Sequence, residues 1–351
     1  MGVVAITLQD LRFRARQFII AVAGAGLVFA MGLLLAGLAA GFTAEINQTV
    51  STMGANAWLV AQGSPGRLAA FPPMTSYAAV AAAQVPGVTR AAPVIVAPQA
   101  AQSRGQTSSV VLIGIEPGHL GAPQVASGRP VAHNGEAVVD TALGVGIGQH
   151  FVVANHDFTV VGTVGNRTLL AGQPDAYVTL SDAQSILYGG RPLIGAVLIS
   201  GVPHQVPHGL QLFTNAQVES ASLNQMAQAV SSIGNSRVFM WVIAAFIVAA
   251  LVYVTALQRT RDFAVLKALG SSSGLLFVGL VVQAVIVALA AAAVAAIIVN
   301  FMTGLFAQPV DIPTSAFVIL PVAALVVGIG ASLAALRRAV SADPALAFAG
   351  G

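Results

Sequence analysis

The sequence predicts an α-helical membrane protein with four transmembrane helices and an α+β extracytoplasmic domain inserted between helices 1 and 2. Three observations lead to this prediction: few charged residues, four long windows without charge, and one long interval with the composition of a folded domain. Of 351 residues, 56% are hydrophobic and only 8% are charged, against about 25% charged residues in soluble domains. Because so few charges cannot cover a surface in water, much of the chain must face something else.

Four windows contain no Asp, Glu, Lys or Arg and are long enough for the roughly 20 residues of a spanning helix. We expect helices because a loop in lipid would leave backbone polar groups unpaired. The predicted spans are residues 17–41, 238–257, 275–302 and 317–336. The first window follows three arginines, as in a secretory signal, but its apolar run exceeds the roughly 7–15 residues of a signal core. We therefore expect an uncleaved helix.

Basic residues predict how the chain is oriented in the membrane. The short segments 1–16, 258–274 and 337–351 contain eight Lys or Arg and three acidic residues, whereas the rest contains seven Arg and nine acidic residues. Because short basic segments stay in the cytoplasm, both termini are expected inside and the segment 42–237 outside. We therefore expect a multi-pass protein of the cell (inner) membrane, surrounded by membrane lipid, with a short outer loop at 303–316.

The segment 42–237 has the composition of a folded domain. Pro, Gly, Asn, Gln and Ser become frequent, and the apolar runs shorten to 4–7 residues rich in β-branched side chains. Such runs, bounded by Gly, Pro, Asn or Asp, are typical of strands. We expect strands at 110–115, 137–140, 151–154, 158–164, 177–180 and 196–200. With short helices at 76–84 and 181–187, the domain is long enough for its own core.

An apolar stripe precedes the second predicted span. Leu223, Met226, Val230 and Ile233 follow the spacing of one helix face. This helix could simply pack on its own domain, or it could be a stalk that carries motion between the membrane and the outer domain. The spacing alone does not separate the two interpretations.

Motifs that would indicate an enzyme are incomplete. A phosphate-binding loop needs a lysine followed by Ser or Thr, but the only lysine, Lys267, is followed by alanine. The letters from Gly270 to Gly274 match the Gly-x-Ser-x-Gly motif of hydrolases, which needs a strand before its serine, whereas here a helical segment precedes it. His204 and His208 have a ligand-like spacing without a third ligand. We expect no catalytic residue, no metal and no cofactor in this chain.

No Asp, Glu, Lys or Arg lies inside any of the four predicted spans. Carriers driven by protons or ions usually need ionisable residues within the membrane. The sequence therefore disfavours a secondary transporter, and we expect another subunit to supply the energy for any transport.

The segment from Arg259 to Gly270 reads Arg-Thr-Arg-Asp-Phe-Ala-Val-Leu-Lys-Ala-Leu-Gly and lies between two predicted spans. It could be a plain basic anchor on the cytoplasmic side. However, Phe263, Leu266 and Leu269 are too apolar for a solvated loop, and a groove on a partner protein would explain them.

This segment resembles FtsX-like permeases, a family that includes MacB-type exporters and lipoprotein-release permeases. After their second span these proteins carry Arg-x-Arg-Glu-apolar-x-apolar-Leu-Lys/Arg-Ala-apolar-Gly, here with Asp262 for Glu and Phe263 for an aliphatic residue. The layout of one span, a large outer domain and three further spans is also similar, as are residues 7–16, 158–164 and 337–344. The resemblance covers the whole chain.

The resemblance implies the permease subunit of an ABC transporter, which is not itself an enzyme. Such a subunit forms a homodimer, or a heterodimer with a related permease, and recruits a cytoplasmic ABC ATPase that binds ATP and Mg²⁺. ATP hydrolysis would then move the extracytoplasmic domain (mechanotransmission) and support export or extraction of a substrate. The residues expected to couple to the ATPase are Arg259, Arg261, Asp262, Phe263, Leu266, Lys267, Leu269 and Gly270. No nucleic-acid partner is expected.

Three other functions stay open at this point. The chain could be an FtsX-like regulator of a cell-wall hydrolase that transports nothing. It could be an importer of a small polar solute, although the spans lack evident polar lining residues. An intramembrane or exported enzyme is disfavoured by the missing catalytic residues.

Overall fold

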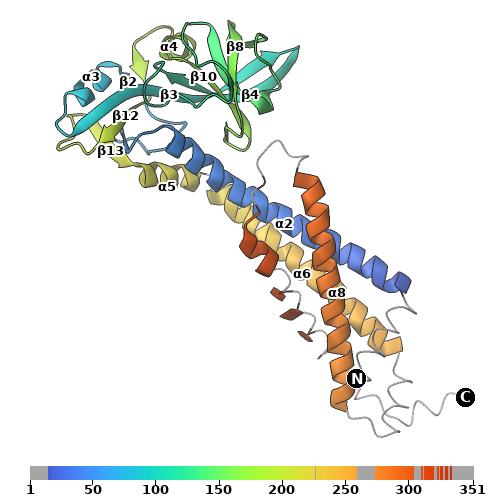
Figure 1. Cartoon of the computed structure of the whole chain (residues 1–351). Helices are drawn as coiled ribbons and strands as arrows, with labels where there is room; N and C mark the ends of the chain where they lie inside the picture. Colours follow the sequence, from blue (N-terminus) through green and yellow to red (C-terminus); the bar gives the residue numbers. More distant parts are fainter. Residues whose placement is uncertain are drawn as a thin grey trace, which may run out of the picture. The chain divides into compact units, whose positions relative to one another are not determined.

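The computed structural model describes residues 15–225, 227–258, 273–303, 310, 312–319, 322–323, 325–326, 329–330 and 333. They fall into two compact units (Figure 1). The sheet unit contains Gly41–Val230, and the helical unit is drawn from the ranges Met1–Ala40, Ser231–Phe306 and Val310–Gly351.

Three long helices build the helical unit: α2 (Ala15–Thr52), α6 (Ala227–Gln258) and α8 (Ser273–Met302). Among the described residues, three stretches are long and apolar enough to cross a membrane: Ala15–Thr52, Val230–Thr255 and Val278–Met302. They overlap the first three predicted spans. All described residues of the fourth window, 317–336, are helical, and a fourth span there stays a prediction.

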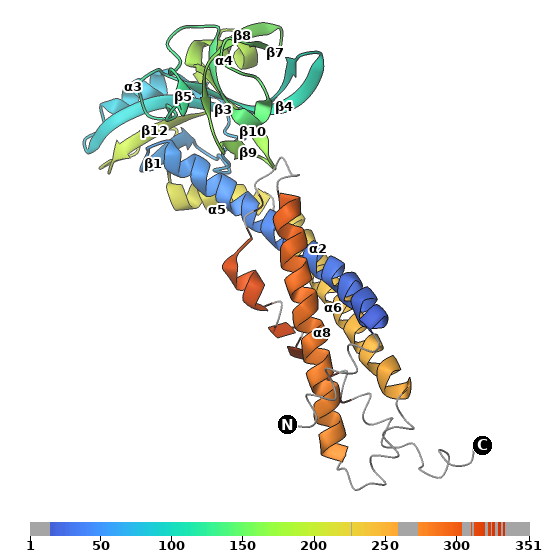
Figure 2. The same ribbon diagram turned by 45° about the vertical axis from the view of Figure 1, so that its right-hand side comes forward.

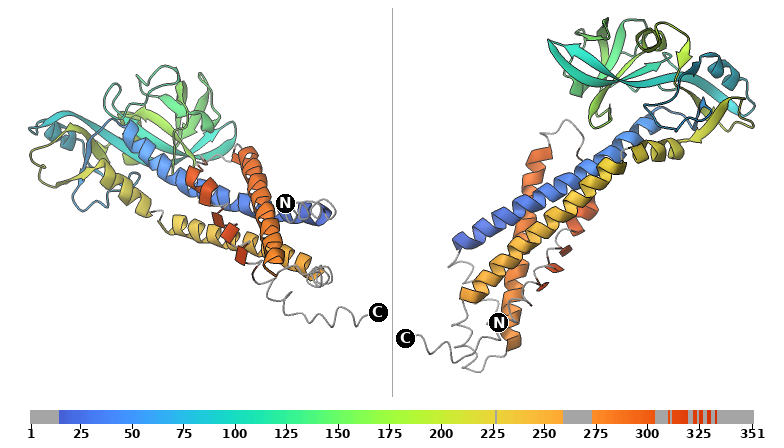
Figure 3. Two further views of the ribbon diagram at one scale, coloured as in Figure 1. Left: turned by 60° about the horizontal axis from the view of Figure 1, so that its bottom comes forward. Right: turned by 180° about the vertical axis from the view of Figure 1, so that it is seen from behind.

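Small residues let these helices pack closely. Their shared core combines Phe29 of α2 with Val248 of α6 and with a series of alanines from α8. A Cβ added to Gly26 of α2 would lie only 3.1 Å from the carbonyl oxygen of Ala291 in α8. Close approach of this kind increases van der Waals contact, which drives helix association in lipid. Figure 3 shows the three helices side by side from two directions.

The sheet unit is built on an 11-stranded sheet with the order β13-β1-β12-β3-β4-β10-β6-β8-β5, in which β7 pairs with β3 and β8, and β9 pairs with β10. Its strands are β1 (Ala57–Ala61), β3 (Val88–Ser103), β4 (Gln106–Ile115), β5 (Ser127–Gly128), β6 (Glu136–Asp140), β7 (His150–Val153), β8 (His156–Val164), β9 (Thr168–Leu169), β10 (Gln173–Thr179), β12 (Ala196–Gly201) and β13 (Leu210–Thr214). A separate two-stranded sheet joins β2 (Met74–Thr75) and β11 (Leu193–Ile194). The short helices are α3 (Tyr77–Ala83), η1 (Thr141–Leu143), α4 (Leu180–Tyr188) and α5 (Asn215–Gln225).

The longest strand, β3, is not among the strands expected from the sequence, and it contains two prolines. Proline is disfavoured in central strands because it has no N–H for the ladder. The carbonyl of Val94 accepts from the N–H of Gly195, next to β12. The backbone groups of successive residues in a strand point alternately to its two neighbouring strands. The backbone nitrogen of Pro98 therefore points toward the β12 side, and that of Pro93 toward the β4 side. Pairing with β4 starts only at Val94 and pairing with β12 ends there, so the missing N–H of each proline faces a stretch without a paired strand.

The six expected strands lie in β4, β6, β7, β8, β10 and β12. The polar run Asn155-His156-Asp157 suggests a turn at these three residues, but the turn between β7 and β8 begins one position earlier. His156 already pairs with Val153, so the loop consists of Ala154 and Asn155 alone, with φ angles of 47° and 66°. Two consecutive positive φ angles are what a two-residue hairpin requires, because that twist matches the flanking strands.

Helices cover both faces of the large sheet (Figures 1 and 2). On one face, buried side chains of β1, β4 and β10 pack with Val50 of α2 and Val218 of α5. On the other face, side chains of the same strands pack with Ala82 of α3 and Ala183 of α4. Full burial of one large apolar side chain, such as that of Ile113, contributes about 1.5–3 kcal/mol. The last residues of α2 and the whole of α5 are therefore integral parts of one face of this unit.

Candidate functional site

The eight residues expected to couple to an ATPase, between Arg259 and Gly270, lie outside the described residues, and their role stays a prediction. Of the predicted stalk residues, Leu223 lies in α5 and packs against the core on the α2 side of the sheet. Val230 and Ile233 lie in α6 and are half-buried. Met226, between the two helices, is outside the described part.

Glu45 of α2 makes the most extensive buried polar contact on this face of the sheet. Its side chain is 2% exposed. One carboxylate oxygen, Oε1, accepts from the hydroxyl of Thr168 at 2.8 Å and from the N–H of Gly172 at 2.8 Å. The other, Oε2, accepts from the N–H of Ala171 at 3.2 Å. A buried carboxylate is tolerated only when it is hydrogen-bonded in this way.

The donors to Glu45 belong to the turn between β8 and β10, residues 165–172. Leu170, Ala171 and Gly172 have φ angles of 53°, 71° and 83°. Glycine adopts such angles freely, but a bulky residue such as leucine does so at a cost of about 1–3 kcal/mol. The left-handed conformation directs two successive N–H groups at one carboxylate. The turn is therefore strained, and Glu45 is the side chain that its backbone donors reach.

A second carboxylate fixes the beginning of the same turn. Asp140, at the end of β6, accepts from the N–H of Ala142 at 2.8 Å and from the N–H of Arg167 at 2.7 Å. The carbonyl of Arg167 accepts from the N–H of Asp175 at 2.9 Å, and Asp175 accepts from the hydroxyl of Tyr177 at 3.2 Å. Complete burial raises the pKa of the Asp175 carboxyl well above its usual range and, with the nearby carboxylate, raises that of Tyr177.

α5 is attached to the same face through Asn215, its first residue. The amide oxygen of Asn215 accepts from Nε1 of Trp58 at 2.9 Å, and its amide nitrogen donates to the carbonyl of Ala55 at 2.9 Å. Further along α5, the hydroxyl of Ser222 accepts from the N–H of Leu68 at 3.0 Å. Each helix on this face is thus held by directed side-chain hydrogen bonds as well as by apolar packing.

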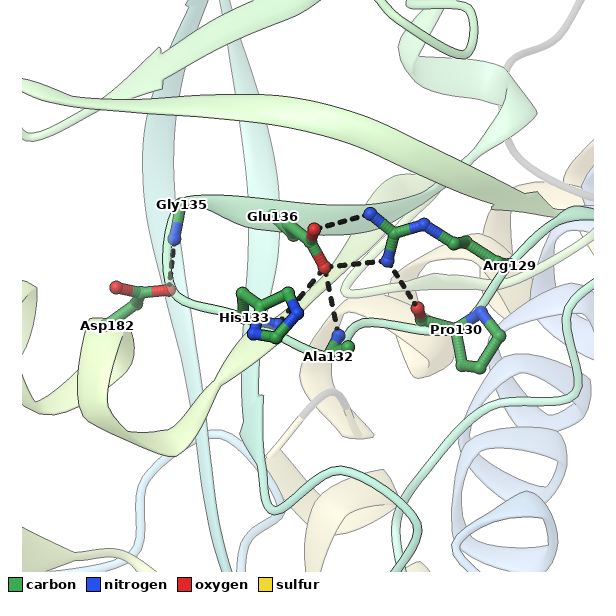
Figure 4. A network of polar contacts seen from close by, with 7 residues as sticks. All are labelled: Arg129, Pro130, Ala132, His133, Gly135, Glu136 and Asp182. Carbon is green, nitrogen blue, oxygen red and sulfur yellow. Dashed lines mark hydrogen bonds and ion pairs between the residues drawn. The ribbon is translucent and has the colours of Figure 1, made fainter.

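Another polar network lies in the loop before β6 (Figure 4). Glu136 accepts from both terminal nitrogens of Arg129, at 2.8 Å from Nη1, and from two backbone N–H groups of the loop. Hydrogen bonding to Arg129 lowers the pKa of Glu136 to about 2. The N–H of Gly135 donates to Asp182 of α4 at 2.9 Å. The charges of Arg129 and Glu136 are thus paired with each other, and the bonds to backbone N–H groups hold the loop in place.

Within the described part of the chain, no group of three or more His, Asp or Glu side chains could hold a metal ion. His204 and His208 are exposed in the loop between β12 and β13. The expectation that they bind no metal stays a prediction.

Sequence reasoning missed Glu45, although a signal exists. Glu45 is the only acidic residue between Asp10 and Glu116, and it follows the first apolar window directly. A single acid so placed indicates a side chain with a dedicated partner. Its partners could not be found from the pattern, because two of them are backbone N–H groups more than 120 positions away.

Comparison with known proteins covers both units. Residues 237–344 match the FtsX-like permease C-terminal family, and residues 18–233 match the MacB-like periplasmic core domain. An uncharacterized ABC transporter permease of Mycobacterium tuberculosis is 39% identical over 343 residues, 98% of either chain, and another from the same species is 36% identical over the same share. The chain belongs to the MacB-type, FtsX-like permeases of ABC transporters.

As a permease of this family, the chain is a membrane component of an ABC transporter, and the family implies a cytoplasmic ATPase as partner. The three apolar helices among the described residues and the MacB-like domain fit the expected membrane protein with an extracytoplasmic domain. The periplasmic region of MacB from Actinobacillus actinomycetemcomitans aligns with 51% of this chain and 98% of its own, at 14% identity and a TM-score of 0.37. The extracellular domain of YknZ, a noncanonic ABC-type transporter from Gram-positive bacteria, aligns with 47% and 88%, at 16% identity and a TM-score of 0.33.

Proposed function

We propose that this permease converts ATP hydrolysis by a partner ATPase into movement of its sheet unit, which acts outside the cytoplasm on a substrate to be exported or extracted. The observation that carries the proposal is the attachment of α2 and α5 to one face of the sheet. α2 is a single helix whose earlier residues belong to the helical unit and whose last residues belong to the sheet unit. A displacement of α2 would therefore reach the sheet through Glu45 and the apolar contacts beside it.

The energy would come from outside this chain. The sequence has no phosphate-binding loop, so ATP and Mg²⁺ would bind to the ATPase. We place the contact with the ATPase at residues 259–270 and expect two permease chains per complex. The predicted orientation, with both termini in the cytoplasm, puts this segment on the ATPase side.

ATPase capture tests the coupling segment. Phe263→Ala, Leu266→Ala and Gly270→Ala should weaken co-purification of the partner ABC ATPase. Loss of one buried anchor typically costs about 2 kcal/mol or more, which is about 30-fold in affinity. Arg259→Lys and Arg261→Lys keep the positive charge and should do less harm. If the three truncated variants retain the ATPase as well as the wild type does, the segment is only a basic anchor.

Movement of the sheet unit can be measured directly, because the chain contains no cysteine. A single cysteine at Ser108, an exposed position on β4, can carry one spin label per chain. In a dimer with bound ATPase, the distance between the two labels should change between the nucleotide-free state and the state trapped with ATP, Mg²⁺ and vanadate. An unchanged distance distribution would contradict the proposed function.

A further inference from the structure

The contact between Glu45 and the turn has the features of a switch. The turn adopts a strained backbone, and strain of this kind persists only where surrounding groups enforce it. Two of its N–H groups, those of Ala171 and Gly172, find their acceptor on Glu45. Thr168, which lies in the short strand β9 within the same turn, adds a third bond. We propose that Glu45 is a latch: its carboxylate holds the 165–172 turn in the left-handed conformation, and displacement of α2 releases the turn.

The latch responds to position because its bonds are directional. α2 also contacts this face through Ile46 and Val50, whose side chains lie in the apolar core, as does that of Met53 just after the helix. Apolar contacts depend on buried area and tolerate small sliding movements. Hydrogen bonds weaken steeply with distance and angle. A shift of α2 by about one ångström would therefore keep most of the apolar contact and break the bonds to Glu45 first.

Release of the turn would act on the centre of the sheet. The turn leads into β10, which pairs with β4 on one side and with β6 on the other. Its first residue, Gln173, also pairs with Leu169 of β9. The strand order makes β10 the link between β4 and β6. A change at the turn would thus displace β10 and, through it, the paired strands β4 and β6 on its two sides.

The surroundings of the turn provide hydrogen-bonding capacity for a second arrangement. Three buried polar atoms near it have no partner among the described residues: Nη1 of Arg167, Oε1 of Gln173 and Oδ1 of Asp175. Unsatisfied buried groups are rare in native structures, and each calls for an explanation, such as stored strain or a bound water. Two of these atoms, on Gln173 and Asp175, are acceptors that lie within four positions of the freed N–H groups along the chain. The latch can therefore open without leaving every donor unpaired.

This inference rests on the proposed function, and the test separates the two. Hydrogen exchange of the full chain with its ATPase would be measured without nucleotide and after trapping with ATP, Mg²⁺ and vanadate. In the wild type, peptides covering 165–174 should exchange about tenfold or more faster in one state than in the other, as expected when hydrogen bonds worth about 1.4 kcal/mol are lost. In Glu45→Gln the amide oxygen can still accept from Thr168 and Gly172, but the NH2 group meets the N–H of Ala171, donor against donor. The turn should therefore exchange faster than in the wild type in both states.

Two variants serve as controls. Glu219→Gln makes the same change on α5, at a side chain without a hydrogen bond or ion pair among the described residues, and should behave like the wild type. Thr168→Val removes only one of the three bonds to Glu45. It should raise exchange of the turn about threefold without nucleotide and keep the nucleotide dependence, so it carries the test if Glu45→Gln does not fold. Unchanged exchange of β1 and β12 confirms the fold of each variant.

Two results would overturn the latch. The first is equal exchange of residues 165–174 in both nucleotide states of the wild type, while the Ser108 label distance changes; the proposed function would then stand without the latch. The second is wild-type exchange of the turn, with its nucleotide dependence, in folded Glu45→Gln. If neither the distance nor any exchange rate responds to nucleotide, the proposed function itself fails.

Discussion

Replacing Asn215 with alanine should destabilise the sheet unit by about 2–4 kcal/mol. The change removes the acceptor for Nε1 of Trp58 and the donor to the carbonyl of Ala55, both at 2.9 Å. Trp58 is fully buried, so its N–H would stay unsatisfied at a cost of about 1–3 kcal/mol. The lost bond to Ala55 adds about 1 kcal/mol. For a unit of this size, the sum corresponds to a fall in melting temperature of about 5–15 °C.

Tryptophan fluorescence offers a specific assay. The chain has two tryptophans, and a Trp241→Phe background leaves Trp58, beside Asn215, as the sole reporter. Asn224→Ala is the matched control, because Asn224 is exposed on the same helix; it should leave the melting temperature nearly unchanged. Asn215→Asp keeps an acceptor for Trp58 and should cost about half as much as Asn215→Ala. If Asn215→Ala melts within 2 °C of the control, the anchoring role of this residue is refuted.

Further predictions concern pH and topology. The folded pKa of Glu136 lies near 2, below its ordinary value of 4.5. Its pairing with Arg129 therefore stabilises the fold above pH 4.5, and this stabilisation is lost as the pH falls toward 2. In Glu136→Gln the melting temperature should depend less on pH between 4.5 and 2. Asp175 has the opposite sign: its raised pKa means that the fold gains stability as the pH falls through that pKa toward 3.8. Asp175→Asn, which mimics the protonated acid, should melt at an equal or higher temperature at pH 7, and a clear loss would contradict the burial argument. A cysteine at Ser103 should label from outside intact cells and one at Ser272 should not; the reverse would overturn the orientation.

The sequence predicted those parts of the fold that depend on local composition. Charge-free windows indicate the apolar stretches of α2, α6 and α8, and β-branched runs indicate six of the strands. β3 was not predicted, because Pro93 and Pro98 argue against a central strand. Both are accommodated only through the particular register in which their missing N–H groups face unpaired stretches of the neighbouring strands. Register of this kind depends partly on β12, whose paired residues lie about 100 positions away.

The candidate site was less predictable than the fold for a similar reason. Glu45 is separated from Thr168 by 123 positions, and Trp58 from Asn215 by 157. Two donors to Glu45 are backbone groups, which every residue except proline possesses. A left-handed turn at Leu170 and Ala171 has no sequence signal either, because those residues disfavour that conformation. The coupling segment at 259–270 lies outside the described residues, and its role stays a prediction made from its residues alone.

The β3–β4 hairpin has a practical consequence for imaging a membrane protein of 35.4 kDa. Its two-residue tip, Arg104 and Gly105, closes a register in which Ser103 still pairs with Gln106. A Cβ on Gly105 would meet nothing within 4 Å, and the one side-chain bond of Arg104 is to the exposed Gln149. A short epitope inserted between Arg104 and Gly105 would therefore disturb little. An antibody fragment bound to it would add the mass and asymmetry that particle alignment needs.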